Sequence, residues 1–250
     1  MRPDTELTVV LVYPELLGTY GDRGNALALV RRAQLRNVPV RILKVPLGRP
    51  LPAGDIYLLG GGEDAAEVLA LRSLSGQRQA RAVLGEASAC LAVCAGLQIL
   101  AREFETADGR REAGLGLLDV SCGRLPGRRA VGEVLVDPTG IADLPMLTGY
   151  ENHQGDAVVM ADAQPLGRVV QGVGNGVARL DGAVQGHIVG TYLHGPVLVR
   201  NPALADRLIE WAAGPLLPVC DEAVERLRAE RLAACRGKWL SVRRVALLGG

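Results

Sequence analysis

The sequence has almost no net charge, with 28 basic against 27 acidic residues and a formal charge of +1. This balance gives no overall electrostatic footprint for nucleic acid or for an anionic membrane surface, so any partner must be recognised locally. The sequence also lacks a run of roughly 18 apolar residues that could span a membrane, and its first residues lack the apolar stretch of a signal peptide. We therefore expect a cytoplasmic protein.

The cysteines are few and odd in number. The five of them, Cys90, Cys94, Cys122, Cys220 and Cys235, are spread widely along the chain. Without export signals, this pattern argues against a disulfide framework and for reduced thiols. Cys90 and Cys94 lack a second close cysteine pair or an adjacent histidine, so a zinc site is also disfavoured and no metal is expected.

The apolar segments predict an α/β fold. Hydrophobic residues make up 48% and charged residues 22% of the 250 residues, which is ordinary for a globular protein with a substantial core. Continuous apolar runs at 8–13, 38–45, 56–59 and 89–93 predict strands that are covered on both faces. Helical periodicity over 25–36, between the first two runs, predicts a right-handed parallel crossover. The sequence therefore predicts a mostly parallel sheet flanked by helices.

The rest of the chain predicts additions to this sheet. Further helices are expected at 64–71, 77–87, 95–104, 202–213 and 219–235, and a further strand at 187–192. The stretch 116–189 consists of short β-rich pieces broken by Gly, Pro and Asp, which predicts β-hairpins beside the parallel sheet. We expect one α/β domain over 1–213, followed by a C-terminal helical extension over 214–250 that ends in a loosely held tail.

A cysteine lies at the junction between a predicted strand and a predicted helix. In Ala92-Val93-Cys94-Ala95-Gly96-Leu97, small residues flank Cys94, and this pattern is typical of a nucleophile elbow. The amide groups at the start of the following helix should favour the thiolate, which is the reactive form. The alternative is that Cys94 is a buried small hydrophobe, as free cysteines usually are.

A glycine run is placed to help such a nucleophile. A thiolate that attacks an amide needs backbone N–H donors for the developing oxyanion. Gly60-Gly61-Gly62 follows a buried strand directly, and adjacent strands that end at one edge would bring it near Cys94. We therefore expect the amide of Gly61 or Gly62 to join that of Ala95 in an oxyanion hole. The alternative is a tight turn that binds no ligand.

Of the three histidines, His194 fits the role of a base best. It closes a predicted strand and precedes Gly195-Pro196, at the edge where the elbow should lie. Histidine is the usual proton carrier near neutral pH. His153 lies in a polar segment, 149–155, which we expect to be a loop suited to binding or partner contact. His187 begins a strand, where a structural role is expected.

Five motifs occur in a characteristic order. They are Tyr13-Pro14-Glu15-Leu16-Leu17, Tyr20-Gly21-Asp22-Arg23-Gly24-Asn25, Gly60-Gly61-Gly62-Glu63-Asp64, Gly149-Tyr150-Glu151-Asn152-His153 and Tyr192-Leu193-His194-Gly195-Pro196. Together they resemble the class I glutamine amidotransferases of the cobyric-acid-synthase-like branch. Within that branch they are most similar to GatD, the glutaminase subunits of bacterial lipid II isoglutaminyl synthases. The resemblance covers about 13–211.

The resemblance implies a fold, a reaction and a partner. The implied fold is the flavodoxin-like class I amidotransferase fold, and the implied reaction is glutamine hydrolysis through a thioester at Cys94. Ammonia would pass to a Mur-ligase-like, ATP-dependent subunit, MurT, in a heterodimer that converts D-glutamate of lipid II to D-isoglutamine. ATP and magnesium would bind the partner, with no cofactor in this chain. By position, Arg129 would hold the glutamine carboxylate, with Arg128 as the alternative.

The sequence departs from the family pattern at three places, one of which is Glu63 in place of the usual glutamine after the glycines. The family elbow usually reads Gly-x-Cys-Gly-Gly, whereas this chain has Ala92 and Ala95. Many class I amidotransferases carry an acid two residues after the histidine, and Pro196 occupies that place here. The carboxylate that orients His194 must therefore come from elsewhere in the chain or from the partner. We hypothesise that the isolated subunit hydrolyses glutamine slowly until the ligase docks.

Two other functions share these features. Amidotransferases of cobalamin-precursor synthesis have the same elbow, but they normally carry an ATP-dependent synthetase domain on the same chain. This chain has no Gly-x-x-x-x-Gly-Lys-Ser/Thr phosphate loop. A non-catalytic amidotransferase-fold scaffold is the other alternative, because a fold alone does not establish an activity.

Overall fold

The computed structural model describes residues 6–247 and is built around a six-stranded sheet. The strand order is β13 (Ala183–Gln185), β14 (Ile188–Thr191), β4 (Ala89–Val93), β3 (Ile56–Leu59), β1 (Leu7–Val12) and β2 (Val40–Val45). All neighbours are parallel except β13, which pairs antiparallel with β14. The predicted mostly parallel sheet is confirmed.

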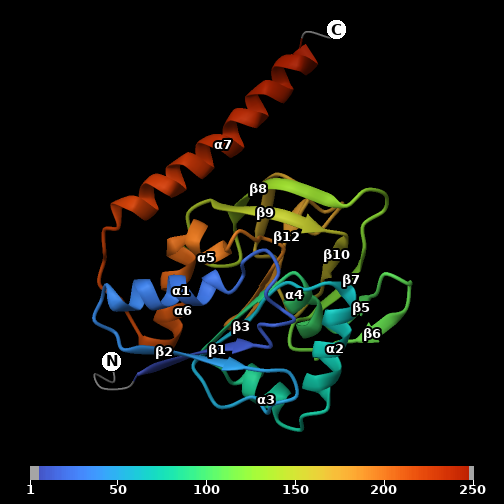
Figure 1. The fold of residues 1–250 in the computed structure, drawn as a ribbon. Coiled ribbons are helices and arrows are strands. Elements are labelled where there is room, and N and C mark those ends of the chain that lie inside the picture. The colour runs from blue at the N-terminus through green and yellow to red at the C-terminus, as the bar shows by residue number, and fades with distance from the viewer. Residues whose placement is uncertain (1–5, 248–250) are drawn as a thin grey trace.

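Helices cover both faces of this sheet, which explains the continuous apolarity of its strands (Figure 1). Val10 and Val12 of β1 belong to a core cluster with α2 (Asp64–Ser75), α3 (Ala80–Gly85) and α4 (Ala95–Leu100). Val9 and Leu11 belong to a second cluster with α1 (Gly24–Gln34) and α6 (Pro202–Ala213). Neighbouring residues of one strand thus face different cores, and neither face can be polar.

Two smaller sheets fill the predicted hairpin region. One has the order β10 (Gly155–Val159), β7 (Val120–Arg124), β5 (Glu103–Glu105) and β6 (Arg111–Ala113). The other has the order β12 (Leu180–Asp181), β11 (Gly167–Gln171), β8 (Ala130–Pro138) and β9 (Leu147–His153). The helix expected over 95–104 is too long, because α4 ends at Leu100 and β5 begins at Glu103. In β5 only Phe104 is buried between two less buried glutamates, the period-two pattern of a strand.

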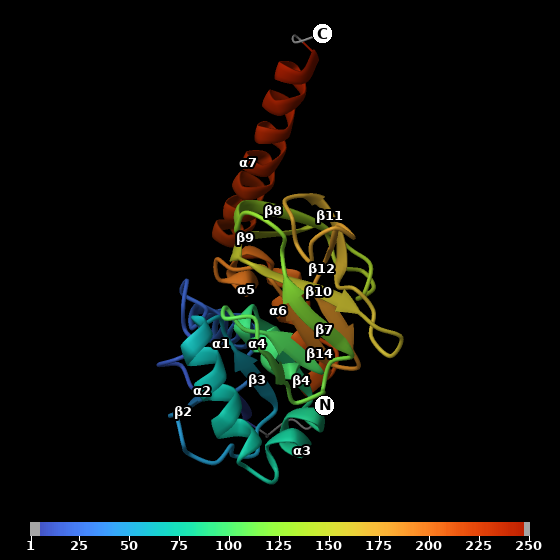
Figure 2. The ribbon, with the colours of Figure 1, turned by 90° about the vertical axis from the view of Figure 1, so that its right-hand side faces the viewer.

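The C-terminal helix extends away from the rest of the fold (Figures 1 and 2). The short helix α5 (Val197–Arg200) and strands β8 and β9 contact α7 (Glu222–Leu247). Arg228 of α7 donates hydrogen bonds to the carbonyl oxygens of Met146 and Arg200. The loose tail expected over 236–250 is wrong for 236–247, which continue the helix, and 248–250 lie outside the described residues. Nowhere in 6–247 does a helix have the length and apolarity needed to cross a membrane.

Candidate active site

The predicted site residues meet at one edge of the central sheet. Four adjacent strands, β14, β4, β3 and β1, run parallel and end at the same edge. His194 follows β14, Cys94 follows β4, Gly60–Gly62 follow β3, and Asp22 lies in the loop after β1. The carboxyl edge of a parallel sheet is where α/β proteins usually bind their ligands. The topology alone therefore gathers these four segments.

The turn at Cys94 has the strained geometry of a nucleophile elbow. Its φ of 54° and ψ of −107° lie in a region that non-glycine residues rarely adopt, at a cost of about 1–3 kcal/mol. Ala92 and Ala95, which replace glycines of the family pattern, both have negative φ. The backbone strain of the turn is therefore not at these two alanines. A Cβ atom on Gly96 would lie 2.6 Å from the Leu59 carbonyl oxygen. The turn therefore needs glycine at position 96 and tolerates alanine beside the cysteine.

His194 is held by a buried carboxylate. Its Nδ1 lies 3.2 Å from Asp22 Oδ2, and the two side chains are 0% and 1% exposed. Because the carboxylate accepts this hydrogen bond, the neutral imidazole carries its proton on Nδ1. His194 Nε2 is buried and has no hydrogen-bond partner within the described part of the chain. The unprotonated nitrogen is therefore available to take a proton from a neighbouring group.

Pro196 helps to bring this carboxylate into place. A Cβ atom on Gly24 would lie 2.5 Å from Pro196 Cγ, so the proline packs directly on the glycine. The Asn25 side chain also accepts a 2.9 Å hydrogen bond from the Leu198 amide. These contacts tie the loop that carries Asp22 to the segment after β14. The sequence left two sources for the carboxylate that contacts His194, another part of the chain or a partner protein. In the structure Asp22 of the same chain occupies this position, so the geometry does not require a partner to supply it.

Gly61 is the point where these side chains converge. A Cβ atom built on Gly61 would lie 2.7 Å from His194 Cε1, 3.3 Å from Asp22 Oδ2 and 3.5 Å from Cys94 Cβ. The three side chains therefore surround one position on the backbone. Only a residue without a side chain leaves them room to face one another.

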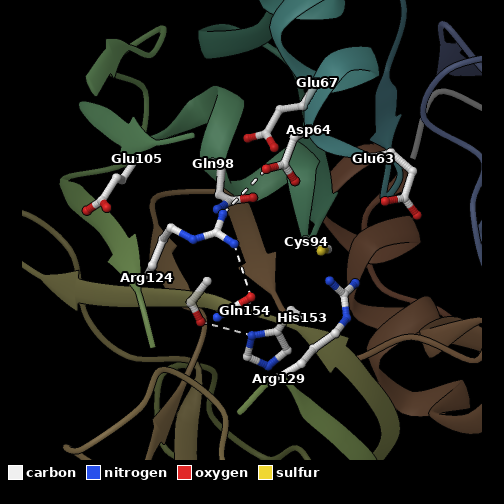
Figure 3. A pocket seen from close by; sticks show the side chains of 12 residues that line it. Glu63, Asp64, Glu67, Cys94, Gln98, Glu105, Arg124, Arg129, His153 and Gln154 are labelled. Atoms are coloured by element: carbon white, nitrogen blue, oxygen red, sulfur yellow. Dashed lines mark hydrogen bonds and ion pairs between the residues drawn. The ribbon is translucent and has the colours of Figure 1, made fainter. Parts of the chain in front are cut away.

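Cys94 and Arg129 line the same pocket (Figure 3). Figure 3 shows the Arg129 guanidinium directed toward Cys94. Arg128 is exposed and is not among the residues that line this pocket. Of the two arginines left open by the sequence, the structure therefore brings Arg129 to the cysteine.

A chain of contacts links Arg129 to His194 through two intervening side chains. The Arg129 guanidinium donates to the side chain of Asn152 and, at 2.8 Å, to its backbone oxygen. The Asn152 amide group donates a 2.6 Å hydrogen bond to the hydroxyl of Tyr20. The Tyr20 ring packs edge-on against His194, with ring centroids 4.9 Å apart. The orientation of the arginine is thus coupled to the imidazole.

Residues 8–202 match the CobB/CobQ-like glutamine amidotransferase domain. The chain belongs to this family. It is 32% identical over 211 residues to the GatD subunit of lipid II isoglutaminyl synthase (glutamine-hydrolyzing) from Staphylococcus aureus (strain N315), covering 83% of this chain and 84% of that protein. It is 33% identical over 177 residues to cobyric acid synthase from Sphingopyxis alaskensis, covering 68% of this chain and 34% of that protein. The PurLQS structure from Thermotoga maritima shares the fold, with a TM-score of 0.55 at 17% identity over 83% of this chain and 97% of that chain.

Membership of this family makes the protein a glutamine-hydrolysing amidotransferase. The alternative of a non-catalytic scaffold is therefore set aside. The expected class I amidotransferase fold is also confirmed by this family match and by the PurLQS structure.

One expected member of this amidotransferase's oxyanion hole is engaged elsewhere. The Gly61 amide donates a 2.8 Å hydrogen bond to Asp22 Oδ2, so of the two glycine amides considered it is the one already engaged by the protein. The Gly62 amide makes no hydrogen bond within the described residues. The Ala95 amide donates to the Cys94 side chain and lowers the pKa of its thiol. Gly62 and Ala95 therefore remain as the donors of the expected oxyanion hole.

We predict that Gly61→Ala removes most glutaminase activity. The added methyl would lie 2.7 Å from His194 Cε1 and would push the imidazole away from Cys94. We expect a loss of kcat of at least about 100-fold, because a displacement of about 1 Å has an effect of this size. Glutamine hydrolysis and thermal unfolding of the variant would be measured together, with Gly123→Ala as the control, because an added Cβ there meets nothing within 4 Å and the backbone does not have a positive φ. Near-normal activity of Gly61→Ala would contradict the geometry described above.

The resting Cys94 is a thiol. Burial raises the pKa of Cys94 to about 12, and the nearby Glu67 and Asp22 charges add to this effect. The Ala95 amide and the Arg129 charge lower the pKa of Cys94, but they do not outweigh burial. The amide at the helix start thus lowers the pKa of Cys94, as expected, but burial has the larger effect. The thiol proton of Cys94 must therefore leave as the reaction begins, and this step needs a base beside the sulfur.

The polar segment around His153 is a strand, against the expectation of a loop. Gly149 and Tyr150 lie in β9, and Tyr150 exchanges two backbone hydrogen bonds with His194, at 2.9 and 3.0 Å. His153 is 2% exposed and stacks on Tyr192, with ring centroids 4.0 Å apart. The segment thus builds the wall of the pocket. His187 is exposed and stacks on Trp211 away from the pocket.

Several pocket residues were not anticipated from the sequence. Arg124 is fixed by Asp64 at 3.4 Å and by Gln154 at 3.0 Å, and Glu67 and Gln98 lie beside it (Figure 3). They come from α2, α4, β7 and the turn between β9 and β10, and no motif links them. For Asp22, a signal was present, since it follows the first buried strand in Tyr20-Gly21-Asp22-Arg23-Gly24-Asn25. A carboxylate after a central strand is placed at the sheet edge by the fold itself.

Proposed function

We propose that this glutaminase hydrolyses L-glutamine through a thioester at Cys94 and supplies ammonia to an ATP-dependent, Mur-ligase-like partner. The observation that carries the proposal is the convergence of Cys94, His194 and Asp22 around Gly61, with Cys94 also lining a pocket. The reaction needs a reduced thiol, and Cys94 is not part of a disulfide. The proposal therefore places the protein in a reducing compartment such as the cytoplasm.

The chemistry follows from this geometry. His194 Nε2 takes the thiol proton as Cys94 attacks the amide carbon of glutamine, and Asp22 stabilises the imidazolium that forms. The Gly62 and Ala95 amides donate hydrogen bonds to the tetrahedral oxyanion. His194 then returns the proton to the departing ammonia, which leaves a thioester on the sulfur. Water activated by His194 cleaves that thioester and releases glutamate.

Arg129 is proposed to bind the α-carboxylate of glutamine. A guanidinium offers paired donors to a carboxylate and stays charged at all working pH values. We predict that Arg129→Ala raises KM for glutamine by about 10- to 100-fold, as expected for the loss of a charged hydrogen bond. Steady-state glutaminase kinetics would show this effect, whereas the matched variant Arg128→Ala should leave KM within about twofold. An effect of Arg128→Ala equal to that of Arg129→Ala would reject the assignment.

The proposed acceptor is the D-glutamate of lipid II, which the partner converts to D-isoglutamine. The similarity to the GatD subunit extends over 84% of that protein, whereas the match to the cobyric acid synthase covers only 34% of its length. The match thus spans most of the GatD subunit but only about a third of the cobyric acid synthase. ATP and magnesium would bind the partner. Amidation of a cobalamin precursor is the second candidate, because the cobyric acid synthase is also 33% identical.

The decisive experiment is an amidation assay with the co-purified partner. The complex would be supplied with ATP, magnesium, glutamine and either lipid II or a cobalamin-precursor acid, and the amidated product would be identified by mass spectrometry. Amidation of lipid II alone is the expected result. Amidation of the cobalamin precursor alone would establish the second candidate, and amidation of neither acid would reject both acceptors.

A further inference from the structure

A buried acid in the pocket has no partner. Glu67 lies in the first turn of α2 and is only 4% exposed, yet it lines the same pocket as Cys94. Its Oε1 atom is buried and has no hydrogen-bond partner among the described residues. Figure 3 shows its carboxyl group on the pocket side of the helix, across the pocket from Arg129. Burying a carboxyl group without a hydrogen-bond partner costs free energy. The protein by itself does not offset this cost at Glu67.

The other acids of the pocket differ from Glu67. Asp64 already pairs with Arg124, at 3.4 Å. Glu63 is exposed and Glu105 is half-buried, so water can solvate both of their carboxylates. Burial raises the pKa of Glu67 well above its usual value, and Asp64 adds to this effect while Arg124 opposes it. Glu67 is thus the acid of this pocket that gains most from a cation brought in by a ligand.

The proposed substrate carries such a cation. Glutamine at neutral pH has an α-carboxylate and an α-ammonium group on the same carbon, at the end opposite its amide. If Arg129 binds the carboxylate and Cys94 attacks the amide, the ammonium group needs an acceptor in the remaining wall of the pocket. A carboxylate satisfies an ammonium group better than a neutral acceptor does.

We propose that the Glu67 carboxylate binds the α-ammonium group of L-glutamine and makes the site selective for amides that carry an α-amino group. This assignment rests on the proposed glutaminase function. It makes Glu67 a specificity-determining residue, which contacts the substrate at a distance from the reacting bond. An amide without the amino group would leave the buried carboxyl unpaired and would be rejected.

The test compares two amides in two variants. Glutaramate, the monoamide of glutaric acid, has the carboxylate and amide of glutamine but no amino group. We expect Glu67→Gln, which keeps the side-chain shape, to lower kcat/KM for L-glutamine by about 10- to 100-fold and to leave kcat/KM for glutaramate within about twofold. Glu86→Gln, which removes an exposed acid outside this pocket, should leave both values unchanged.

Other outcomes would overturn the assignment. An equal loss for both amides would show that Glu67 has a structural role, and unchanged discrimination in Glu67→Gln would show that the ammonium group binds elsewhere. If Glu67→Gln fails to fold, binding of the two amides to Cys94→Ser decides the question, since equal affinities would reject the assignment. Failure of the proposed function is distinguishable: the unmodified protein would then hydrolyse no glutamine, and Cys94→Ser would bind neither amide.

Discussion

Cys94→Ser should lower glutamine hydrolysis by more than about a thousandfold, while the complex still amidates its acceptor with added ammonium salt. A serine hydroxyl is a far poorer nucleophile than a cysteine sulfur in a site built around a thiol, and only the glutaminase step uses the sulfur. The measurement is an amidation assay with the co-purified partner, with glutamine or ammonium chloride as the nitrogen source. Loss of both activities would instead indicate that Cys94 has a structural role.

Two controls sharpen this experiment. Cys90 lies in the same strand as Cys94 but is completely buried, so Cys90→Ala should retain both activities. A glutamine-like electrophile such as diazo-oxo-norleucine should add its mass to the wild-type protein and to Cys90→Ala, but not to Cys94→Ser. Labelling of Cys94→Ser would place the nucleophile elsewhere.

The elements of the central sheet were predictable because their signal is local. Continuous apolar runs identify strands buried on both faces, and β3 and β4 occupy the predicted residues 56–59 and 89–93. The elbow was predictable for the same reason, since strand, small residues and helix follow one another in sequence. A parallel sheet then brings the ends of its central strands to one edge, so proximity of Cys94 and His194 followed from topology.

The contacts between distant segments were not predictable. Asp22 and His194 are 172 residues apart, and nothing in either segment states that their side chains meet. The absence of an acid at Pro196 pointed to a missing carboxylate but not to its source, because the packing of Pro196 on Gly24 exists only in three dimensions. The burial of Glu67 is likewise a property of the assembled pocket. Motif order thus indicated the proposed nucleophile and base, while their supporting groups required the fold.

Asp22→Asn tests whether this chain contains its complete set of catalytic groups. Asparagine keeps the shape of the side chain but cannot stabilise the imidazolium of His194, so we expect kcat to fall by about 100- to 10,000-fold. The control is Asp143→Asn, which removes an exposed acid at a turn with φ of 61°, a conformation that asparagine tolerates. Its kcat should stay within about twofold of the wild-type value.

The same variant distinguishes the two sources considered for the orienting carboxylate. Glutaminase rates of wild type and Asp22→Asn would be measured with and without the co-purified partner. If Asp22 is the orienting group, the variant remains slow in both conditions, because no partner residue can replace a buried carboxylate whose side chain is 1% exposed. Restoration of the rate by the partner would show that docking supplies the carboxylate, as hypothesised from Pro196. Any acceleration of the wild type by the partner would then have to act on another group, such as the oxyanion donors beside Gly61.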